Sequence, residues 1–578
     1  MFRISRVARL AARPVLGACV LYVGATISVT ENSAPMTRDK DGTGVSFERG
    51  ETLTNWSGTH SCSPGRLYEP ESEQDVMKIL ADHHASSSKL RPVGTALSPN
   101  GIGMADGTQD MISLSAMDHI CIDKEKMEVT CGAGARVSQV LAALSKKGLT
   151  LENFSSIQEQ QMGGWTQVAA HGTGCGLSTV EEQVVRMKLA TPTNGLMVLS
   201  ADNEGWLFKW AKVGLGALGV VTELTLKVMP AMSLKESTTV LGKDEVLKGH
   251  AERLQDYRHC RYMWVPNTED TVVVLSNPTT DAHTTAGTTA AADATAPLSE
   301  LLLRSTVSKG TSSSSAAAAA AAAAVSKKEA RALSFAQLRD ALLDLNPVDS
   351  AHIRAVNQAE AAFWRRAAQH QPQRVADSTD VLGFDCGGQQ WVLEVCFPIG
   401  SLDDIAAAQR SALGFYPSLG GSKDGPKDLL FVQRVLTTID KHGIAAPSPI
   451  EQRWSARSTS PMSPAFSLDP KAIFCWVGVI MYLPPSQTED QRTAITRNFR
   501  EYIARLQPLF DEVGAKTHWA KVELPPADAP DYDDRLLSQQ RRMRVLYPVD
   551  EFMAIKAALD PRGILSNELV ERLFIKKG

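Results

Sequence analysis

Two hydrophobic periods alternate along most of the chain and together predict an α+β protein. Between Thr54 and Met229, the stretches "EPESEQDVMKILADHHASSS" and "VSQVLAAL" carry apolar residues at helical spacing, which predicts amphipathic helices. The stretches "KLRPVG", "MISL", "EEQVVRMKLATPTNGLMVLS" and "LGVVTELTLKVMP" predict strands, and "HICIDKEKMEVTCGAG" predicts a hairpin. We therefore expect a first unit of short strands and flanking helices, rather than a βαβ dinucleotide fold.

A second domain follows. Strands such as "QQWVLEVCFP" and "FCWVGVIMYLP" alternate with amphipathic helices, which predicts an antiparallel sheet backed by helices. A chain of 578 residues is also too long for a single core. We place the first domain at residues 47–232, the second at 233–540 and a C-terminal segment at 541–578.

The second domain contains a segment of low complexity. From Thr279 to Val325 the composition falls to Thr, Ala, Ser and Gly, ending in "SSSSAAAAAAAAAV". Such a segment buries too little apolar surface to offset the entropy of ordering it. We interpret residues 279–325 as an insertion at a surface loop without chemistry of its own, and polyalanine favours a solvated helix over residues 316–330.

The N-terminal 46 residues differ in kind from the rest. Four arginines, at positions 3, 6, 9 and 13, precede the first acidic residue, Glu31, and lie along one side of a helix. This pattern is typical of a mitochondrial presequence, and the alternative is a secretory signal. The uncharged stretch "PVLGACVLYVGATISVT" that follows is slightly short for a bilayer. Whether it anchors the protein in the inner membrane, sorts it or is removed stays open.

Charge and cysteine content exclude several classes of protein. Sixty basic and sixty-four acidic residues give a net charge of −4, which provides no overall field for nucleic acid. The nine cysteines form no CxxC pair and show no zinc spacing. The sequence therefore supports neither a disulfide framework nor a structural metal.

Glycine-rich stretches recur at four places in the first domain: "VGTALSPNGIG", "CGAG", "QMGGWTQVAAHGTG" and "VGLGALGVV". Glycine lets the backbone approach a ligand or a neighbouring strand. Successive N–H groups in such turns bind anions, including a pyrophosphate, without a lysine or a metal. Ordinary turn chemistry is the alternative for any one stretch, but the four together favour a long ligand lying between strands.

Longer motifs carry a specific resemblance. The segments "NWSGTH", "RPVGTALSPNGIG", "GLTLENFSSIQEQQMGG", "AHGTG" and "GLGALGVV" resemble the FAD-binding domain of the vanillyl-alcohol oxidase flavoprotein superfamily. The segments "FDCGGQQWV", "SPIEQRWSARSTSPMSPAFS", "WVGVIMYLP", "HWAKVE" and "LDPRGILSNELVE" resemble its aldonolactone oxidoreductase branch, in particular the plant mitochondrial members. The resemblance runs from Glu51 to Phe574 and implies a two-subdomain FAD-binding domain with a cap domain.

The resemblance implies which residues hold FAD. The turn after Arg91 would wrap the pyrophosphate, and relatives that bind flavin covalently have a histidine where this chain has Leu97. Leucine has no nucleophilic atom, so we expect noncovalent FAD. Asn567 matches an asparagine near the isoalloxazine, and a structural histidine in a turn is the alternative for His171. The implied cofactor residues are Arg91, Val93, Gly94, Thr95, Ala96, Leu97, Ser98, Ser155, Gly163, Gly164, His171, Gly172, Thr173, Gly219, Val221, Lys521 and Asn567.

In "SPIEQRW", Glu451 and Arg453 stand two residues apart, so on a strand they project from one face. A carboxylate accepts a hydroxyl proton, and a guanidinium holds lactone oxygens through forked donors. The alternative is a surface salt bridge. Within the family motif we expect Glu451 to act as base or orienter and Arg453 as clamp.

Four further residues complete the expected site. By family analogy, Lys521 supplies a positive charge near the reduced flavin. Ser156 resembles a serine that contacts the substrate, and Ser155 stands where plant members carry alanine and where side-chain size affects access of oxygen. Cys386 is expected to line the substrate pocket, with a plain buried small residue as the alternative.

The resemblance implies an activity and partners. It predicts oxidation of L-galactono-1,4-lactone at C2 to a keto-lactone that enolises to L-ascorbate, with electrons passed to cytochrome c. One alternative is an aldonolactone oxidase that uses oxygen and produces hydrogen peroxide, and another is a role in assembling respiratory complex I. A glycolate- or lactate-type flavin dehydrogenase is disfavoured because its substrate motifs differ from "SPIEQRW". Selectivity among galactono-, gulono- and arabinono-lactones stays open.

Overall fold

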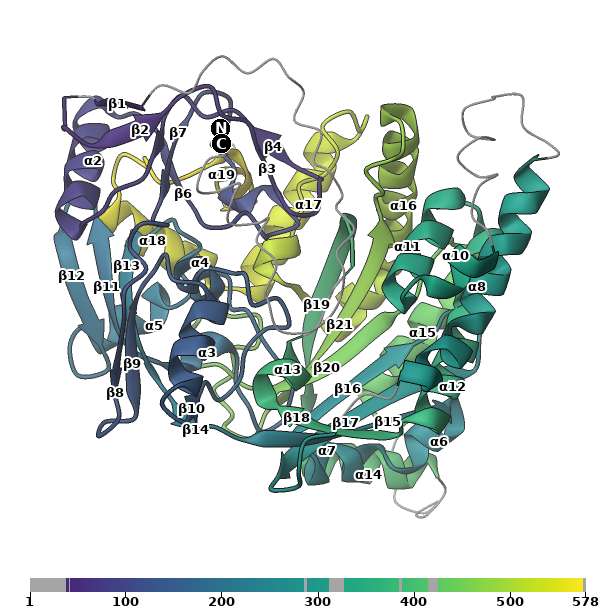
Figure 1. Ribbon diagram of the computed structural model, residues 1–578. Helices are drawn as coiled ribbons and strands as arrows, with labels where there is room; N and C mark the ends of the chain where they lie inside the picture. The colour runs from purple at the N-terminus through teal and green to yellow at the C-terminus, as the bar shows by residue number, and fades with distance from the viewer. Residues whose placement is uncertain are drawn as a thin grey trace.

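The computed structural model describes residues 38–40, 42–284, 288–310, 327–383, 387–413 and 425–574. The N-terminal and C-terminal parts of this chain together form one half of the molecule, and a large sheet with its helices forms the other (Figure 1). The expected α+β class, with a two-subdomain first domain and a cap built on an antiparallel sheet, is confirmed.

The first subdomain is a five-stranded mixed sheet in which β5, β7 and β6 run parallel. Helix α2 (Glu73–Ser86) packs on it, and the Ser72 side chain caps the helix by accepting a hydrogen bond from the Asp75 N–H. The strands, in sheet order, are β1 (Arg38–Lys40), β2 (Ser46–Glu48), β5 (Leu67–Tyr68), β7 (Asp110–Ser113) and β6 (Leu90–Val93).

The second subdomain is a five-stranded antiparallel sheet. Its strands, in sheet order, are β12 (Gly195–Ser200), β11 (Val184–Thr191), β13 (Val220–Lys227), β9 (Glu128–Gly132) and β8 (Ile120–Asp123). The accompanying helices are α3 (Val137–Ser145), α4 (Met162–Gln167), α5 (Gly205–Ala211) and η2 (Val180–Gln183), whereas η1 (Gly101–Gly103) follows β6 in the first subdomain. Two short antiparallel pairs join β3 (Leu53–Thr54) to β4 (Ser61–Cys62) and β10 (Leu149–Thr150) to β14 (Met229–Pro230).

The cap domain is built on an eight-stranded antiparallel sheet, as the alternation in "WVLEVCF" and "CWVGVIM" predicts. In sheet order its strands are β18 (Gln373–Asp377), β15 (Ser233–Gly242), β17 (Asp270–Thr279), β16 (His259–Trp264), β20 (Ile450–Ala456), β21 (Ile473–Tyr482), β19 (Gln390–Gly400) and β22 (Lys516–Thr517). Five helices bury one face of it: α6 (Lys243–Lys248), α7 (His250–Asp256), α14 (Leu402–Ala412), α15 (Lys427–His442) and α16 (Glu489–Val513). The other face turns toward the first domain, with α13 (Ser378–Leu382) nearby (Figure 1).

Part of the low-complexity segment is packed, which corrects our expectation for residues 288–310. They form α8 (Thr288–Gly310), which lies against α10 (Lys327–Ala332), α11 (Phe335–Leu345) and α12 (Ser350–His370). Leu298 and Leu302 of α8 are buried in this helical cluster. The expectation rested on the average composition of residues 279–325, in which these two leucines carry little weight. They nevertheless give one face of the helix enough apolar surface to pack. Residues 311–326, which include the whole polyalanine run, lie outside the described residues.

The C-terminal part of the chain returns to the first domain. Side chains of η3 (Trp519–Lys521), α17 (Tyr532–Leu546), α18 (Val549–Leu559) and α19 (Glu568–Phe574) belong to its hydrophobic core. This return begins at Trp519, earlier than the boundary at residue 541 that we expected. Across the described residues, no helix combines the length and apolarity that crossing a lipid bilayer requires.

Candidate active site

A cavity of about 140 Å³ lies between the two subdomains of the first domain. It brings together residues from the four glycine-rich stretches. Eleven of the expected cofactor residues line it: Arg91, Val93, Gly94, Thr95, Ala96, Leu97, Ser98, Gly163, Gly164, Gly219 and Val221.

The turn after β6 forms one wall of this cavity and is held from behind. Trp56 N–H donates to Ala96 O at 2.9 Å, and Asn55 Nδ2 donates to Ser98 O at 3.0 Å. No atom of the described residues accepts a hydrogen bond from the backbone N–H groups of residues 95–98. Unpaired amides beside a cavity fit the anionic pyrophosphate of a dinucleotide.

Arg91 holds together the segments that surround this cavity. Its guanidinium is buried and donates to the carbonyls of Ile102 at 2.8 Å, Leu565 at 2.7 Å and Leu215 at 2.8 Å. Burial lowers the pKa of Arg91 to about 10. Among the described residues no carboxylate pairs directly with Arg91, and Asp106 supplies the nearby negative charge that acts on it.

Glycine is required at two positions of the expected site. A Cβ on Gly219, which lines this cavity, would lie 2.7 Å from Leu189 Cγ and 2.8 Å from Ala190 O. A Cβ on Gly172, which lines a separate small space beside Arg453, would lie 2.6 Å from Phe154 O. Both contacts are closer than packed atoms tolerate, so a side chain at either position would push the strands apart.

A second cavity, of about 370 Å³, lies between the first domain, helices α11 and α12, and the face of the cap sheet opposite its five covering helices. It meets the first cavity at Leu97 and Gln160, which line both. A ligand as long as FAD can therefore extend from one cavity into the other. Seven of the expected site residues line the second cavity: Leu97, Ser155, Ser156, His171, Glu451, Arg453 and Lys521.

The cap sheet presents Glu451 and Arg453 to this cavity, as their spacing on a strand predicts. Both lie on β20, whose alternate residues Gln452 and Trp454 are buried on the opposite side. Glu451 pairs across the sheet with Gly478 of β21. Because glycine has no side chain, the space beside the carboxylate stays open.

Arg453 lies directly opposite Arg261 of β16, and Glu451 compensates both cations. Arg453 Nη2 is 3.0 Å from Glu451 Oε2, and Arg261 Nη1 is 3.7 Å from Glu451 Oε1. Like charges directly opposite each other destabilise a sheet unless a third group screens them. Arg261 was not among the site residues predicted from the sequence.

Glu394 is a second residue that the sequence analysis missed. It lies on β19 and is 3% exposed, and its carboxylate contacts His171, Arg453 and Lys521. Burial alone would raise the pKa of Glu394, but Lys521, His171 and Arg453 hold it well below its usual value. One signal was available, since a lone glutamate inside the apolar run "WVLEVCF" must be buried and therefore needs partners.

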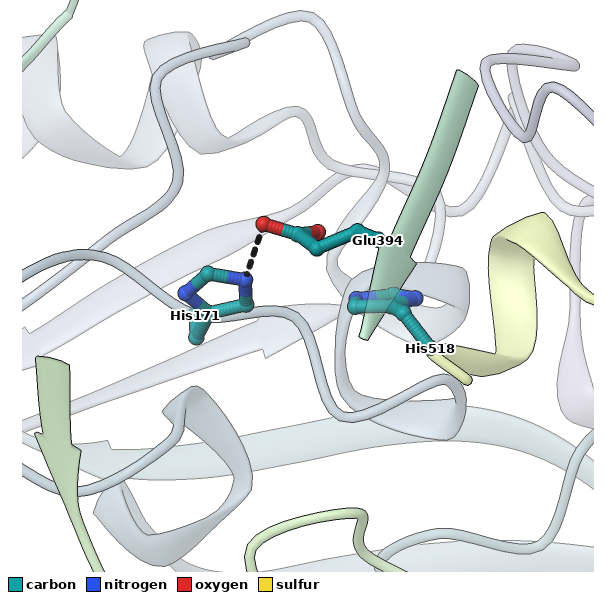
Figure 2. A group of neighbouring side chains, drawn as sticks. All are labelled: His171, Glu394 and His518. Carbon is teal, nitrogen blue, oxygen red and sulfur yellow. Dashed lines mark hydrogen bonds and ion pairs between the residues drawn. The ribbon is translucent and has the colours of Figure 1, made fainter. Parts of the chain in front are cut away.

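Glu394 points toward His171, and the ring of His518 lies close by (Figure 2). The ligand atoms of these three residues all lie within 4.8 Å of one another, as in a site with two histidines and one carboxylate. However, His518 Nδ1 accepts a hydrogen bond from Ala520 N–H, and Lys521 and Arg453 already bind the carboxylate. A neutral His518 then carries its proton on Nε2, so this group suits an organic substrate better than a metal ion.

His171 is fixed between Glu394 and Trp476. Its ring stacks on Trp476 with centroids 3.9 Å apart, and its Nε2 is 3.0 Å from Glu394 Oε1. Burial lowers the pKa of His171, and burial followed by the charge of Lys521 lowers that of His518 well below its usual value. The ring of His518 is therefore neutral near pH 7. Both ring nitrogens of His171 face acceptors, since Nδ1 is 3.0 Å from Gly172 O and Nε2 faces the carboxylate of Glu394.

The serines at positions 155 and 156 border the second cavity, but the hydroxyl of Ser155 is bound to the protein. It donates to Gln160 Oε1 at 2.5 Å and accepts from Trp165 Nε1 at 3.0 Å. Ser155 therefore acts sterically as a small residue whose polar atom already has partners. Cys386, expected to line the substrate pocket, lies outside the described residues.

The remaining expected cofactor residues lie farther from the cavities. Asn567 lines neither and instead donates from Nδ2 to the carbonyls of Gly101 and Met104, so it supports the loop after the cofactor turn. Gly172 and Thr173 line a smaller space beside Arg453, and Thr173 Oγ1 donates to Cys260 O.

Comparisons with known proteins agree with this geometry. The FAD binding domain family matches residues 64–200, and the D-arabinono-1,4-lactone oxidase family matches residues 224–414 and 422–573. A cavity lined by the glycine-rich stretches, next to a second cavity that contains several charged side chains, together with these matches defines an FAD-dependent oxidoreductase. The chain belongs to the D-arabinono-1,4-lactone oxidase family, which confirms the resemblance seen in the motifs.

Individual relatives extend along most of the chain. The mitochondrial L-galactono-1,4-lactone dehydrogenase of Brassica oleracea is 41% identical over 90% of this chain and 82% of its own length. The L-gulonolactone oxidase of Bos taurus is 23% identical over 91% of this chain and 99% of its own length. Cholesterol oxidase from B. sterolicum superposes with a TM-score of 0.68 at 14% identity, over 94% of this chain and 100% of its own, which shows a shared fold.

Proposed function

We propose that this protein oxidises L-galactono-1,4-lactone at C2 and so carries out the last step of L-ascorbate synthesis. The observation that carries the proposal is the Glu451–Arg453 pair on the cap sheet, which faces the cavity that continues from the dinucleotide site. Relatives 40–41% identical over 90% of the chain are named for this dehydrogenase activity.

The two cavities fit FAD and lactone together. The unpaired amides of residues 95–98 and the buried cation of Arg91 would hold the pyrophosphate, and the isoalloxazine would extend past Leu97. When bound, FAD supplies the acceptor for the hydride that leaves C2. The protein must supply the rest of the chemistry, which is the removal of a proton and the orientation of the lactone.

The residues of the cap sheet divide this work. Glu451 is placed to accept the proton of the C2 hydroxyl, since its carboxylate faces the cavity beside the open position of Gly478. Arg453 and Arg261 present guanidinium donors to the lactone oxygens. Lys521 adds a fixed cation on the opposite side of Glu394, where it favours negative charge that develops during oxidation.

For the electron acceptor we propose cytochrome c rather than oxygen. The relatives named as dehydrogenases are 40–41% identical, whereas the relatives named as oxidases are 22–27% identical. Aldonolactone oxidation coupled to oxygen is the second candidate, because Ser155 stands at the position associated with oxygen access. The names of the dehydrogenase relatives also support a mitochondrial location for this chain.

Steady-state kinetics with purified holoenzyme test the proposal. L-galactono-1,4-lactone, L-gulono-1,4-lactone and D-arabinono-1,4-lactone are compared as substrates, with cytochrome c reduction and peroxide yield measured in air and under nitrogen. The proposal expects the highest kcat/KM for the galactono-lactone, with cytochrome c turnover that persists without oxygen. Stoichiometric peroxide with little cytochrome c reduction would favour the oxidase, and no lactone turnover would overturn both.

A further inference from the structure

Glu394 is a buried charge that the fold itself does not require. It occupies the middle of β19, where neighbouring residues such as Leu393 and Val395 pack into the apolar core on the other side of the sheet. Taking a carboxylate out of water costs several kcal/mol unless it is paired and hydrogen-bonded. Glu394 and Glu451 pair with Gly478 from its two sides, so their side chains lie on the same face of the sheet. Glu394 therefore faces the substrate cavity.

Both oxygens of this carboxylate are used, and all three partners come from other segments. Oε1 accepts from His171 Nε2 at 3.0 Å and from Arg453 Nη2 at 3.2 Å, and Oε2 accepts from Lys521 Nζ at 2.9 Å. Among the described residues, Glu394 is the one carboxylate within ion-pair distance of Lys521. Lys521 therefore depends on Glu394 for its orientation, and Arg453 is held between Glu394 and Glu451.

We propose that Glu394 is a positioning residue for lactone oxidation, acting through Arg453 and Lys521 rather than on the substrate itself. The inference rests on the proposed function for the identity of the reaction. The carboxylate holds one cation on each side of the cavity and keeps them from repelling each other. It also binds His171, which links the cap sheet to the first domain.

An electrostatic consequence separates this role from a structural one. Cations and carboxylates alternate around the cavity, and among the described residues that line it Glu394 and Glu451 supply the negative charges. Loss of Glu394 makes the site more positive, which eases the release of a proton within it, so the alkaline limb of the pH profile moves to lower pH. The more positive site also favours a reduced, anionic flavin, so the midpoint potential of bound FAD rises. The groups that face Glu394 or its partners are His171, Arg261, Glu451, Arg453, His518 and Lys521.

The test substitutes Glu394→Gln, which keeps the shape of the side chain and removes its charge. We expect kcat/KM for the lactone to fall at least tenfold, with FAD content and thermal midpoint close to those of the wild type. The alkaline limb and the flavin potential should shift in the directions given above. Asp270→Asn is the matched control, because Asp270 is a buried carboxylate on the same sheet, paired with Arg365 and away from both cavities.

The outcomes decide the proposal in either direction. It is overturned if Glu394→Gln loses no more activity than Asp270→Asn, or if the pH profile and the potential stay unchanged. If Glu394→Gln gives no soluble protein, Glu394→Asp decides, since it keeps the charge on a shorter arm. We then expect a wild-type alkaline limb with reduced kcat, and wild-type kcat and KM would overturn the proposal.

The design separates failure of this inference from failure of the proposed function. The flavin potential needs no substrate, so it tests the electrostatic role of Glu394 even if the wild type oxidises no lactone. If the wild type is active and the Glu394→Gln variant is unaffected, the role of Glu394 is excluded and the proposed function stands. If the wild type oxidises no lactone but the flavin potential of Glu394→Gln differs from that of the wild type, the lactone is excluded as substrate and the electrostatic role of Glu394 stands.

Discussion

Arg261 and Arg453 occupy directly opposed positions on β16 and β20, with their side chains lining the same cavity. Glu451, the next cavity-facing residue on β20, lies within 3.0 Å of one guanidinium and 3.7 Å of the other. The arrangement concentrates hydrogen-bond donors where lactone oxygens would lie. It also means that the expected base is the counter-charge for two cations.

The Glu451→Gln variant tests the assignment of the base. A general base contributes typically 10²–10⁴-fold to a rate. We therefore expect kcat to fall by about that factor, while FAD remains bound because Glu451 does not line the dinucleotide cavity. The measurement is the anaerobic rate of flavin bleaching with excess lactone. A bleaching rate within threefold of the wild type, on the order of 1 kcal/mol or less, would exclude Glu451 as the base.

The Gly478→Val variant tests whether the substrate binds against Gly478, which lies between Glu394 and Glu451 on the sheet. A Cβ at residue 478 meets nothing closer than 4.0 Å, so the strand accepts a side chain there. The added isopropyl group would occupy the cavity, and we expect KM to rise at least tenfold with little change in the thermal midpoint. The Gly478→Ala variant serves as a graded control with a smaller effect. An unchanged KM in both variants would place the lactone elsewhere.

Leu97 predicts that the flavin is released when the protein is denatured. Leucine offers no nucleophile for a bond to the isoalloxazine, although it lines both cavities. Precipitating the holoenzyme with acid should leave yellow FAD in the supernatant and a colourless pellet. Flavin fluorescence that stays with the protein on a denaturing gel would contradict the prediction.

Arg91 predicts a link between FAD binding and the C-terminal segment. The Arg91→Met variant removes the donors to the carbonyls of Ile102, Leu215 and Leu565, and each buried unpaired group costs about 1–3 kcal/mol. We expect a lower thermal midpoint and a flavin-to-protein ratio well below that of the wild type. The Arg91→Lys variant keeps the charge but not the forked geometry, and should show a smaller loss. A full flavin load in Arg91→Met would refute the role.

His259 predicts how stability depends on pH. Burial lowers its pKa to about 4, from the ordinary 6.5, and its Nδ1 is 2.8 Å from Thr173 O. Because the unfolded chain takes up the proton first, the contribution of neutral His259 to the free energy of unfolding is complete above pH 6.5 and is lost as the pH falls toward 4. Between pH 7 and pH 5, His259 lowers the free energy of unfolding by about 2 kcal/mol.

Urea unfolding at pH 7 and pH 5 measures this effect. The His259→Gln variant should lose less stability on acidification than the wild type, because glutamine does not titrate. His171 and His518 act in the same direction and remain as background in both proteins. Equal losses in the wild type and the variant would show that His259 is not the source.

Sequence patterns predicted the elements of this fold better than its long-range contacts. Strand alternation located β19 and β21, and the ExR spacing placed Glu451 and Arg453 on one face, because both follow from local geometry. The role of Glu394 depends on partners at positions 171, 453 and 521, which only the folded chain brings together. Asn567 is predicted to lie beside the flavin, and its hydrogen bonds to the loop after the cofactor turn are a contact that the motif did not indicate.

The return of the C-terminal part to the first domain has a consequence for how the enzyme matures. Leu90, on the strand that leads into the cofactor turn, donates its backbone N–H to Ile564, and Asn100 donates to the carbonyls of Trp519 and Val522. A ribosome delivers these partners only at the end of synthesis. The N-terminal half therefore lacks these hydrogen-bond partners until residues 519–564 have been synthesised.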